Sequence, residues 1–137
     1  TKTDLWNNLP EQDHFLESMA EAAKAVTTHC GENILYISVM NRLSVDCDCD
    51  SNPEEPKMAD IGMLASLDPV ALDKACADMV INAPIIGGNK LAETHPHEHL
   101  EGEDKFHLIH PDTNWQAGLR YAEEIGLGSQ AYELITV

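Results

Sequence analysis

The spacing of apolar residues in the first part of the chain predicts a helix followed by a strand. Between Glu11 and His29, apolar side chains recur every three or four positions, as they do along one face of an amphipathic helix. Pro10 suits the first turn of that helix, and Gly31 suits its end. Residues 34–40, with the sequence ILYISVM, are mostly β-branched, aromatic or otherwise apolar, which predicts a buried strand.

The same alternation of strand and helix continues along the rest of the chain. Residues 61–65 are a second short apolar run and predict another buried strand. A helix follows, because Asp68 is a favourable N-cap, Pro69 is a favourable first residue and Pro84 ends it. A third helix is predicted from apolar residues at helical spacing: Trp115, Leu119, Ala122 and Ile125. A short strand is predicted at 132–137.

This order of elements predicts one α/β domain over residues 1–137. We expect a small mixed β-sheet in a single layered domain, packed by about three helices. The length of 137 residues fits one domain with its own core. Residues 84–105 hold Gly87, Gly88 and several histidines, and we expect them to form an exposed His-rich loop.

The charge of the chain excludes two classes of partner. Eight basic residues stand against 24 acidic ones, for a formal net charge of −16. Such a surface does not neutralise the phosphates of nucleic acid or of an anionic membrane. No apolar stretch approaches the roughly 20 residues that span a bilayer. Four cysteines in a domain of this size do not indicate a secreted disulfide scaffold, so we expect a cytoplasmic protein.

The segment VDCDCDSNPEEP, residues 45–56, is the strongest candidate for chemistry. It places Cys47 and Cys49 one residue apart, each flanked by aspartates. At this spacing the two sulfurs can share one metal only if the backbone turns, as the acidic loop with Pro53 and Pro56 allows. Tetrahedral zinc or iron–sulfur sites normally take four ligands, mostly Cys or His. Asp60, just before the second strand, is a candidate oxygen ligand. Cys30, at the end of the first helix, is a further candidate.

Other interpretations of this loop remain open. Asp46, Asp48 and Asp50 match the start of a calcium loop, but Ser51 and Lys57 break the pattern where glycine and glutamate are required. A redox pair is disfavoured, because it usually has the spacing C-x-x-C and because neighbouring aspartates raise the pKa of a thiol. The remaining interpretation is a solvated acidic turn.

Two further groups of residues are candidate sites. His95, His97 and His99 alternate, so in an extended segment they would share one face and could bind a divalent metal. Ser66 and Asp68 stand at a strand-to-helix junction, where α/β folds often place ligands. Helix capping alone also explains Asp68.

Three stretches of the chain resemble the C-terminal part of the domain-of-unknown-function 362 family, which are uncharacterised iron–sulfur-centre proteins. They are CDCD, DIGMLASLDPVALDKACADMV and YAEEIGLGSQAYEL, and the resemblance runs from Asn33 to Val137. Its members commonly carry an N-terminal α/β portion and a ferredoxin-like insert with repeated cysteine runs. Neither is present in this chain, so the resemblance implies a fragment of a longer iron–sulfur protein, with 4Fe–4S clusters in the missing part. The matched positions are Cys47, Cys49, Asp60, Ser66, Asp68 and Asp73.

Three functional hypotheses follow. The first is a redox-linked metal-binding domain, in which Cys47 and Cys49 contact iron, zinc or an iron–sulfur cluster. Its partners would be the missing N-terminal or ferredoxin-like part of the parent protein, a redox partner or a second copy of the chain. The second is a structural or interaction domain without its own metal. The third is a metal-assisted enzyme that uses Asp60, Ser66 and Asp68, and whether the chain is an enzyme stays open.

Overall fold

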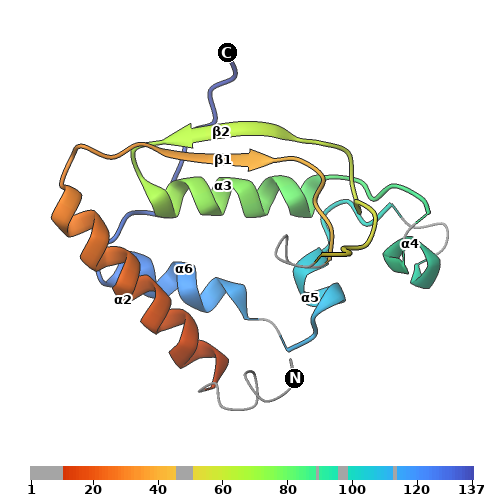
Figure 1. Cartoon of the computed structure of the whole chain (residues 1–137), viewed down its shortest axis with the longest axis horizontal. Coiled ribbons are helices and arrows are strands. Elements are labelled where there is room, and N and C mark those ends of the chain that lie inside the picture. The colour runs from red at the N-terminus through yellow and green to blue at the C-terminus, as the bar shows by residue number, and fades with distance from the viewer. Residues whose placement is uncertain (1–10, 46–50, 89, 96–98, 113) are drawn as a thin grey trace.

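A two-stranded sheet and several helices form the domain (Figure 1). The computed structural model describes residues 11–45, 51–88, 90–95, 99–112 and 114–137. Within them the elements are α2 (Gln12–Cys30), β1 (Tyr36–Met40), β2 (Gly62–Ser66), α3 (Pro69–Asn82), α4 (Lys90–Thr94), α5 (Lys105–Ile109) and α6 (Trp115–Glu124). This architecture confirms the predicted small α/β domain.

The two strands pair in antiparallel fashion, with Tyr36 opposite Ser66 and Met40 opposite Gly62. Figure 1 shows α3 lying along one face of the sheet, with α2 and α6 beyond α3 on the same side. Met40 and Val80 pack with Met58 in a core between the sheet, α3 and the β1–β2 connection. Among the described residues the sheet therefore has one covered face, and it is antiparallel rather than mixed.

The helices α2 and α6 pack against each other and close a second core. Ala20 of α2, Val70 of α3 and Ala122 of α6 are buried together. Small residues allow this close approach: a Cβ added at Gly118 of α6 would lie 3.5 Å from the Cβ of Leu16 in α2. The three predicted helices are confirmed, with ends within a few residues of those expected.

The predicted strand at the C-terminus is wrong. Residues 131–137 carry no strand assignment, and they donate or accept none of the backbone hydrogen bonds found between elements of the described chain. The sequence there favours an extended conformation, but a strand also needs a partner edge. This segment, which we call the tail (131–137), leaves the domain beside β2.

The expectation of an exposed loop at 84–105 is wrong at several positions. The segment contains α4, and Ile85, Leu91, Leu100 and Lys105 are buried. The backbone of Ile85 pairs with Met58 and donates to the carbonyl of His99 at 3.0 Å. The few apolar residues of this polar segment thus form a small core of their own. No described helix is long and apolar enough to cross a membrane.

Candidate functional site

The long connection between β1 and β2 is held together at its neck. The N–H of Ile61 donates to the carbonyl of Met40 at 2.9 Å, and the N–H of Lys57 donates to the carbonyl of Leu43 at 2.7 Å. Between these bonds, the N–H of Arg42 donates to Oδ1 of Asp60 at 2.8 Å. We call residues 40–45 and 54–61 the stem, because they carry the cysteine-containing segment between them. The stem is fixed by backbone bonds of the kind that support a ligand-bearing loop.

The stem is also anchored in the core. Met58 is buried beside Met40 and Val80, and Lys57 is only 1% exposed. The Lys57 ammonium forms an ion pair with Glu54, and the carbonyl of Lys57 accepts a bond of 2.8 Å from the N–H of Ile86. A buried ammonium is tolerated only when it is paired in this way. In the sequence, Lys57 appears only as a residue that breaks the calcium pattern, and that pattern does not predict its burial.

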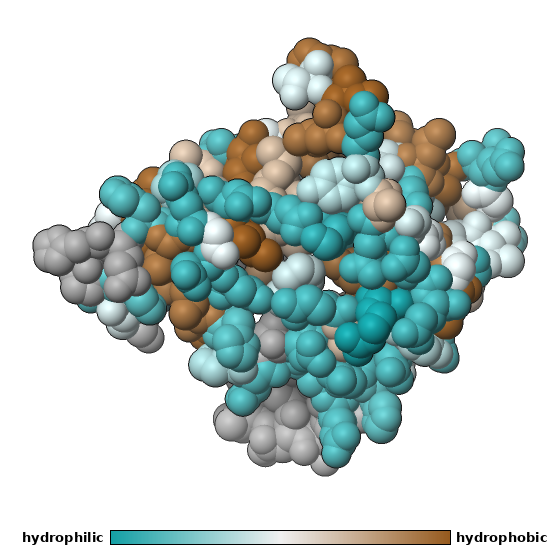
Figure 2. All heavy atoms as spheres, turned by 180° about the vertical axis from the view of Figure 1, so that it is seen from behind, coloured by the Kyte–Doolittle hydropathy of each residue, from teal (hydrophilic) through white to brown (hydrophobic). Residues whose placement is uncertain are grey.

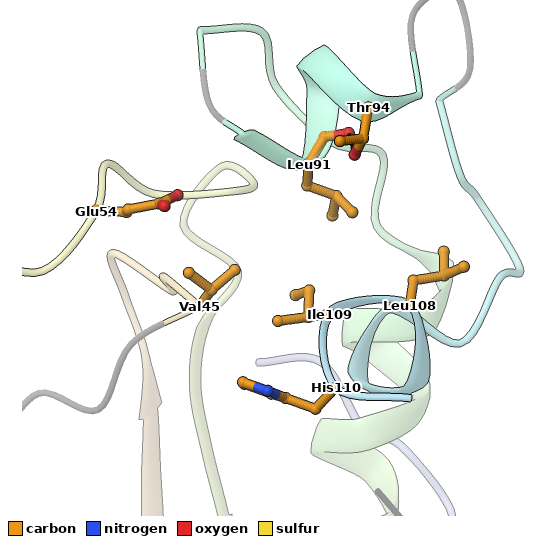
Figure 3. A pocket seen from close by; sticks show the side chains of 7 residues that line it. All are labelled: Val45, Glu54, Leu91, Thr94, Leu108, Ile109 and His110. Atoms are coloured by element: carbon orange, nitrogen blue, oxygen red, sulfur yellow. Dashed lines mark hydrogen bonds between the residues drawn. The ribbon is translucent and has the colours of Figure 1, made fainter. Parts of the chain in front are cut away.

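A pocket lies between the stem, α4 and the end of α5 (Figure 3). Its volume is about 320 Å³, and it is lined by Val45, Glu54, Leu91, Thr94, Leu108, Ile109 and His110. In Figure 3 the side chains of Val45 and Glu54 come from the stem, and His110 extends from the end of α5. A smaller cavity of about 120 Å³ shares Val45, Ile109 and His110. Both cavities are mainly apolar, so they suit a small apolar group better than an ion.

Cys47 and Cys49 lie outside the described residues. They follow Val45 and precede Ser51, so the stem holds both flanks of their segment. Cys30 ends α2 at the start of β1, whereas the stem begins where β1 ends (Figure 1). Five residues of strand separate them by about 16 Å, and β1 therefore keeps Cys30 away from the stem.

Cys76 is placed as a packing residue. It lies on the same face of α3 as Val80, and this face packs against Met40 and Met58. Burial raises the pKa of its thiol, a hydrogen bond with Ser38 lowers it and Asp73 raises it further, and the net shift is upward. A thiol in this state is protonated near neutral pH and is a poor nucleophile and ligand.

Asp60, Ser66 and Asp68 do not meet in one site. Asp60 is bound to the stem at Arg42, whereas Ser66 and Asp68 lie at the other end of β2. Ser66 Oγ accepts from the N–H of Asp68 at 2.9 Å. Asp68 Oδ1 accepts from the N–H groups of Val70 and Ala71, and its Oδ2 accepts from the N–H of Ser129 at 2.8 Å. Backbone donors thus occupy the Asp68 carboxylate, as helix capping predicts.

The histidines at 95 and 99 line a shallow, open pocket of about 340 Å³ together with Glu93. Nδ1 of His95 lies 3.0 Å from Thr94 Oγ1 and 3.2 Å from the carbonyl of Leu91. His97 lies outside the described residues. Across the described part of the chain, no group of three or more His, Cys, Asp or Glu side chains is arranged to hold a metal ion.

Two features of the structure were missed by the sequence patterns. Lys105 is 1% exposed, and its ammonium donates to the carbonyls of Ile81 at 2.6 Å and Leu100 at 2.5 Å. Burial lowers the pKa of this lysine, although Glu101, Glu103 and Asp104 raise it in part. Gly128 touches Asp68, since an added Cβ would lie 2.0 Å from Asp68 Oδ1. In the sequence, only the glycine-containing stretch YAEEIGLGS pointed to the contact between Gly128 and Asp68.

Comparison with curated proteins and with solved structures found no match. A family model described as Domain of unknown function (DUF362) matches residues 2–78, which is more than half of the chain. The match includes CDCD, the stem, β1, β2 and most of α3, and it stops before YAEEIGLGS. The chain therefore belongs to the DUF362 family.

Proposed function

We propose that this domain binds a transition metal ion or an iron–sulfur cluster through Cys47 and Cys49, in a redox-linked role in the cytoplasm. The observation that supports it is the closed stem, which fixes both flanks of the segment that carries the two thiols. Ligands need such support if they are to keep their geometry. The chain's membership of the DUF362 family supports it as well, since the match includes CDCD.

The donor set fits iron or zinc better than magnesium or calcium. Thiolates are soft ligands that select zinc, copper(I) and iron–sulfur centres, whereas hard cations take oxygen ligands. Asp60 would add one carboxylate from the neck of the stem. Two thiolates and one carboxylate leave a tetrahedral site incomplete. The remaining ligands would come from a ferredoxin-like part of the parent protein, a redox partner or a second copy of this chain.

When bound, such a centre would accept or donate an electron, or would hold two protein parts together. The residues of this chain would supply the thiolates and keep the segment attached to the sheet through the stem. The described geometry does not favour the enzyme hypothesis, because backbone donors occupy Asp68 and because Asp60 lies at the opposite end of β2.

Elemental analysis tests the proposal on protein purified without air and without a His tag. We expect about one iron or zinc ion per chain, or a visible cluster spectrum, which the double substitution Cys47→Ser/Cys49→Ser abolishes while the circular dichroism is unchanged. The matched control is Cys76→Ala, which removes a thiol from α3 and should keep the metal. Metal that survives the double substitution would refute the site. A folded, metal-free wild type would refute binding by this chain alone.

A further inference from the structure

The uncovered face of the β1–β2 sheet carries apolar side chains where polar ones are usual. An antiparallel sheet with one covered face normally shows apolar side chains to the core and polar ones to water. In β1 the side chains of Tyr36, Ser38 and Met40 face α3, whereas Ile37 and Val39 are 60% and 62% exposed. On β2, Met63 is 76% exposed and lies opposite Val39 in the register. Both faces of the sheet thus carry apolar side chains, and the uncovered face has no polar side chain within the two strands.

This outer face extends beyond the strands. Leu35 and Leu67, which continue the same alternation at the paired ends of the strands, are also mostly exposed. We call the set Leu35, Ile37, Val39, Met63, Ala65 and Leu67 the outer face. Figure 1 shows α3 on one side of the sheet; on the opposite side it shows no described helix or strand, but only the end of the tail. A contiguous apolar patch of this kind marks an interaction surface in a soluble protein.

The tail forms a wall along one side of the outer face. A groove of about 400 Å³ lies between the tail, β2 and α3, and Met63, Ala65, Leu134 and Ile135 are among the residues that line it. Leu134 and Ile135 are 54% and 73% exposed. Figure 2 shows apolar side chains gathered around the tail along the upper part of the molecule. The tail therefore widens the apolar surface.

The dimensions of the outer face suit one helix. Two strands about 4.8 Å apart form a surface about 10 Å wide, which is close to the diameter of a helix. Five residues of strand, about 16 Å, match a helix of about three turns. α3 already packs along the inner face of the same two strands in this way. A helix on the outer face would complete the layered arrangement that apolar sheet faces require.

The charges around the outer face select a basic partner. β1 and β2 contain no charged residue. Acidic side chains flank them: Glu32 before β1, Asp60 before β2 and Glu133 in the groove, with Arg42 as the basic neighbour. A second copy of the chain would bring a second net charge of −16 to the assembly. Electrostatic complementarity therefore opposes self-association and favours a cationic rim on the occupant.

We propose that the outer face docks an amphipathic helix of a partner protein, with an apolar stripe flanked by lysine and arginine. The stripe would cover Ile37, Val39 and Met63, and the flanking cations would reach Glu133 beside the groove. This docking site does not depend on whether Cys47 and Cys49 bind a metal, because the outer face and the stem are separate surfaces of the domain.

Two synthetic helical peptides with the same leucine stripe test the proposal, one flanked by lysines and one by glutamates. We expect the lysine-flanked peptide to bind the full chain at least tenfold more tightly in calorimetry at low salt, and to lose most of this advantage at high salt. Ile37→Lys should weaken its binding at least tenfold, and Met63→Gln, a second exposed position, should weaken it as well. The matched control is Val26→Lys on α2, which is equally exposed and should change binding less than twofold.

Three results would overturn the proposal. Equal binding of the two peptides would show that positive charge on the partner does not contribute to docking. Equal weakening by Val26→Lys and Ile37→Lys would show non-specific adhesion. A dimer in light scattering that Ile37→Lys dissociates would make a second copy the occupant of the outer face.

Discussion

Asp68, at the start of α3, accepts a hydrogen bond of 2.8 Å from the backbone N–H of Ser129, which lies 61 residues further along the chain. The same carboxylate accepts bonds of 2.9 and 3.0 Å from Val70 and Ala71 in the first turn of α3. One side chain therefore fixes the start of a helix and the loop that follows α6. Asp68 lies within residues 2–78, which the DUF362 family model matches, whereas Ser129 lies beyond them.

Replacement of Asp68 by alanine should destabilise the domain by about 2–4 kcal/mol. This sum combines the loss of a helix cap with the loss of a charged acceptor for a distant N–H. Urea unfolding followed by circular dichroism measures it. Asp68→Asn keeps an acceptor for the first turn of α3 and should cost less. A loss below about 0.5 kcal/mol for Asp68→Ala would show that water replaces the carboxylate at little cost.

Replacement of Gly128 by alanine should also destabilise the domain. The added Cβ would lie 2.0 Å from Asp68 Oδ1, so either the loop or the cap of α3 must move. Forced contacts of this kind cost about 1–3 kcal/mol. Gly87→Ala is the matched control, because its Cβ would meet nothing within 4 Å, and its effect should stay within about 0.5 kcal/mol. Thermal unfolding of the two variants gives the comparison, and equal midpoints would contradict the expectation.

Replacement of Lys105 by methionine should cost about 2–4 kcal/mol, although the two side chains are similar in shape. It would remove a charged donor from the carbonyls of Ile81 and Leu100, which would keep only the backbone bonds from Gly102 and Glu103. Hydrogen bonds from a charged donor contribute more to stability than bonds between neutral groups. Chemical unfolding measures the loss. Lys74→Met removes a half-exposed lysine that pairs with Asp78 on α3, and its effect should stay below about 1 kcal/mol.

The stability of the domain should fall in acid partly through Asp104. Burial alone would raise the pKa of this carboxyl, but hydrogen bonds from the Trp115 ring, the His107 N–H and Gln116 outweigh it and hold the pKa below its ordinary value. Because the folded state prefers the ionised form, its contribution is complete above about pH 4 and is lost as the pH falls through the lowered pKa.

The fluorescence of Trp115, whose Nε1 donates to Asp104 at 3.0 Å, reports this transition in a Trp6→Phe background. The stability difference between the wild type and Asp104→Asn should be largest near neutral pH and should shrink towards pH 3. A stability difference that is constant with pH would mean that the charge of the Asp104 carboxylate does not contribute to its hydrogen bond with the Trp115 ring.

The sequence predicted those elements whose signal is local. α2, α3 and α6 have apolar periodicity or caps, and β1 and β2 are short apolar runs bounded by polar loops. The prediction of a terminal strand was wrong because a strand needs the free edge of a sheet to pair with, and the local sequence does not encode where that edge lies. The burial of Lys57 and Lys105 was not predicted for a similar reason, since their partners lie in segments that come together only on folding. The exposure of Ile37 and Val39 follows from which face α3 covers, and a five-residue run does not encode that choice.

Burial of Lys57 and Lys105 has a consequence for the surface of the domain. Two of the eight basic residues are removed from the surface, so the exterior is more anionic than the net charge of −16 conveys. Mutual repulsion among the acids should make added salt stabilise the fold, as it does for strongly acidic proteins. The same field concentrates cations of any kind near the surface. Metal retained by the purified chain therefore has to be counted after exchange against excess magnesium, which displaces loosely held ions and leaves those bound by thiolates.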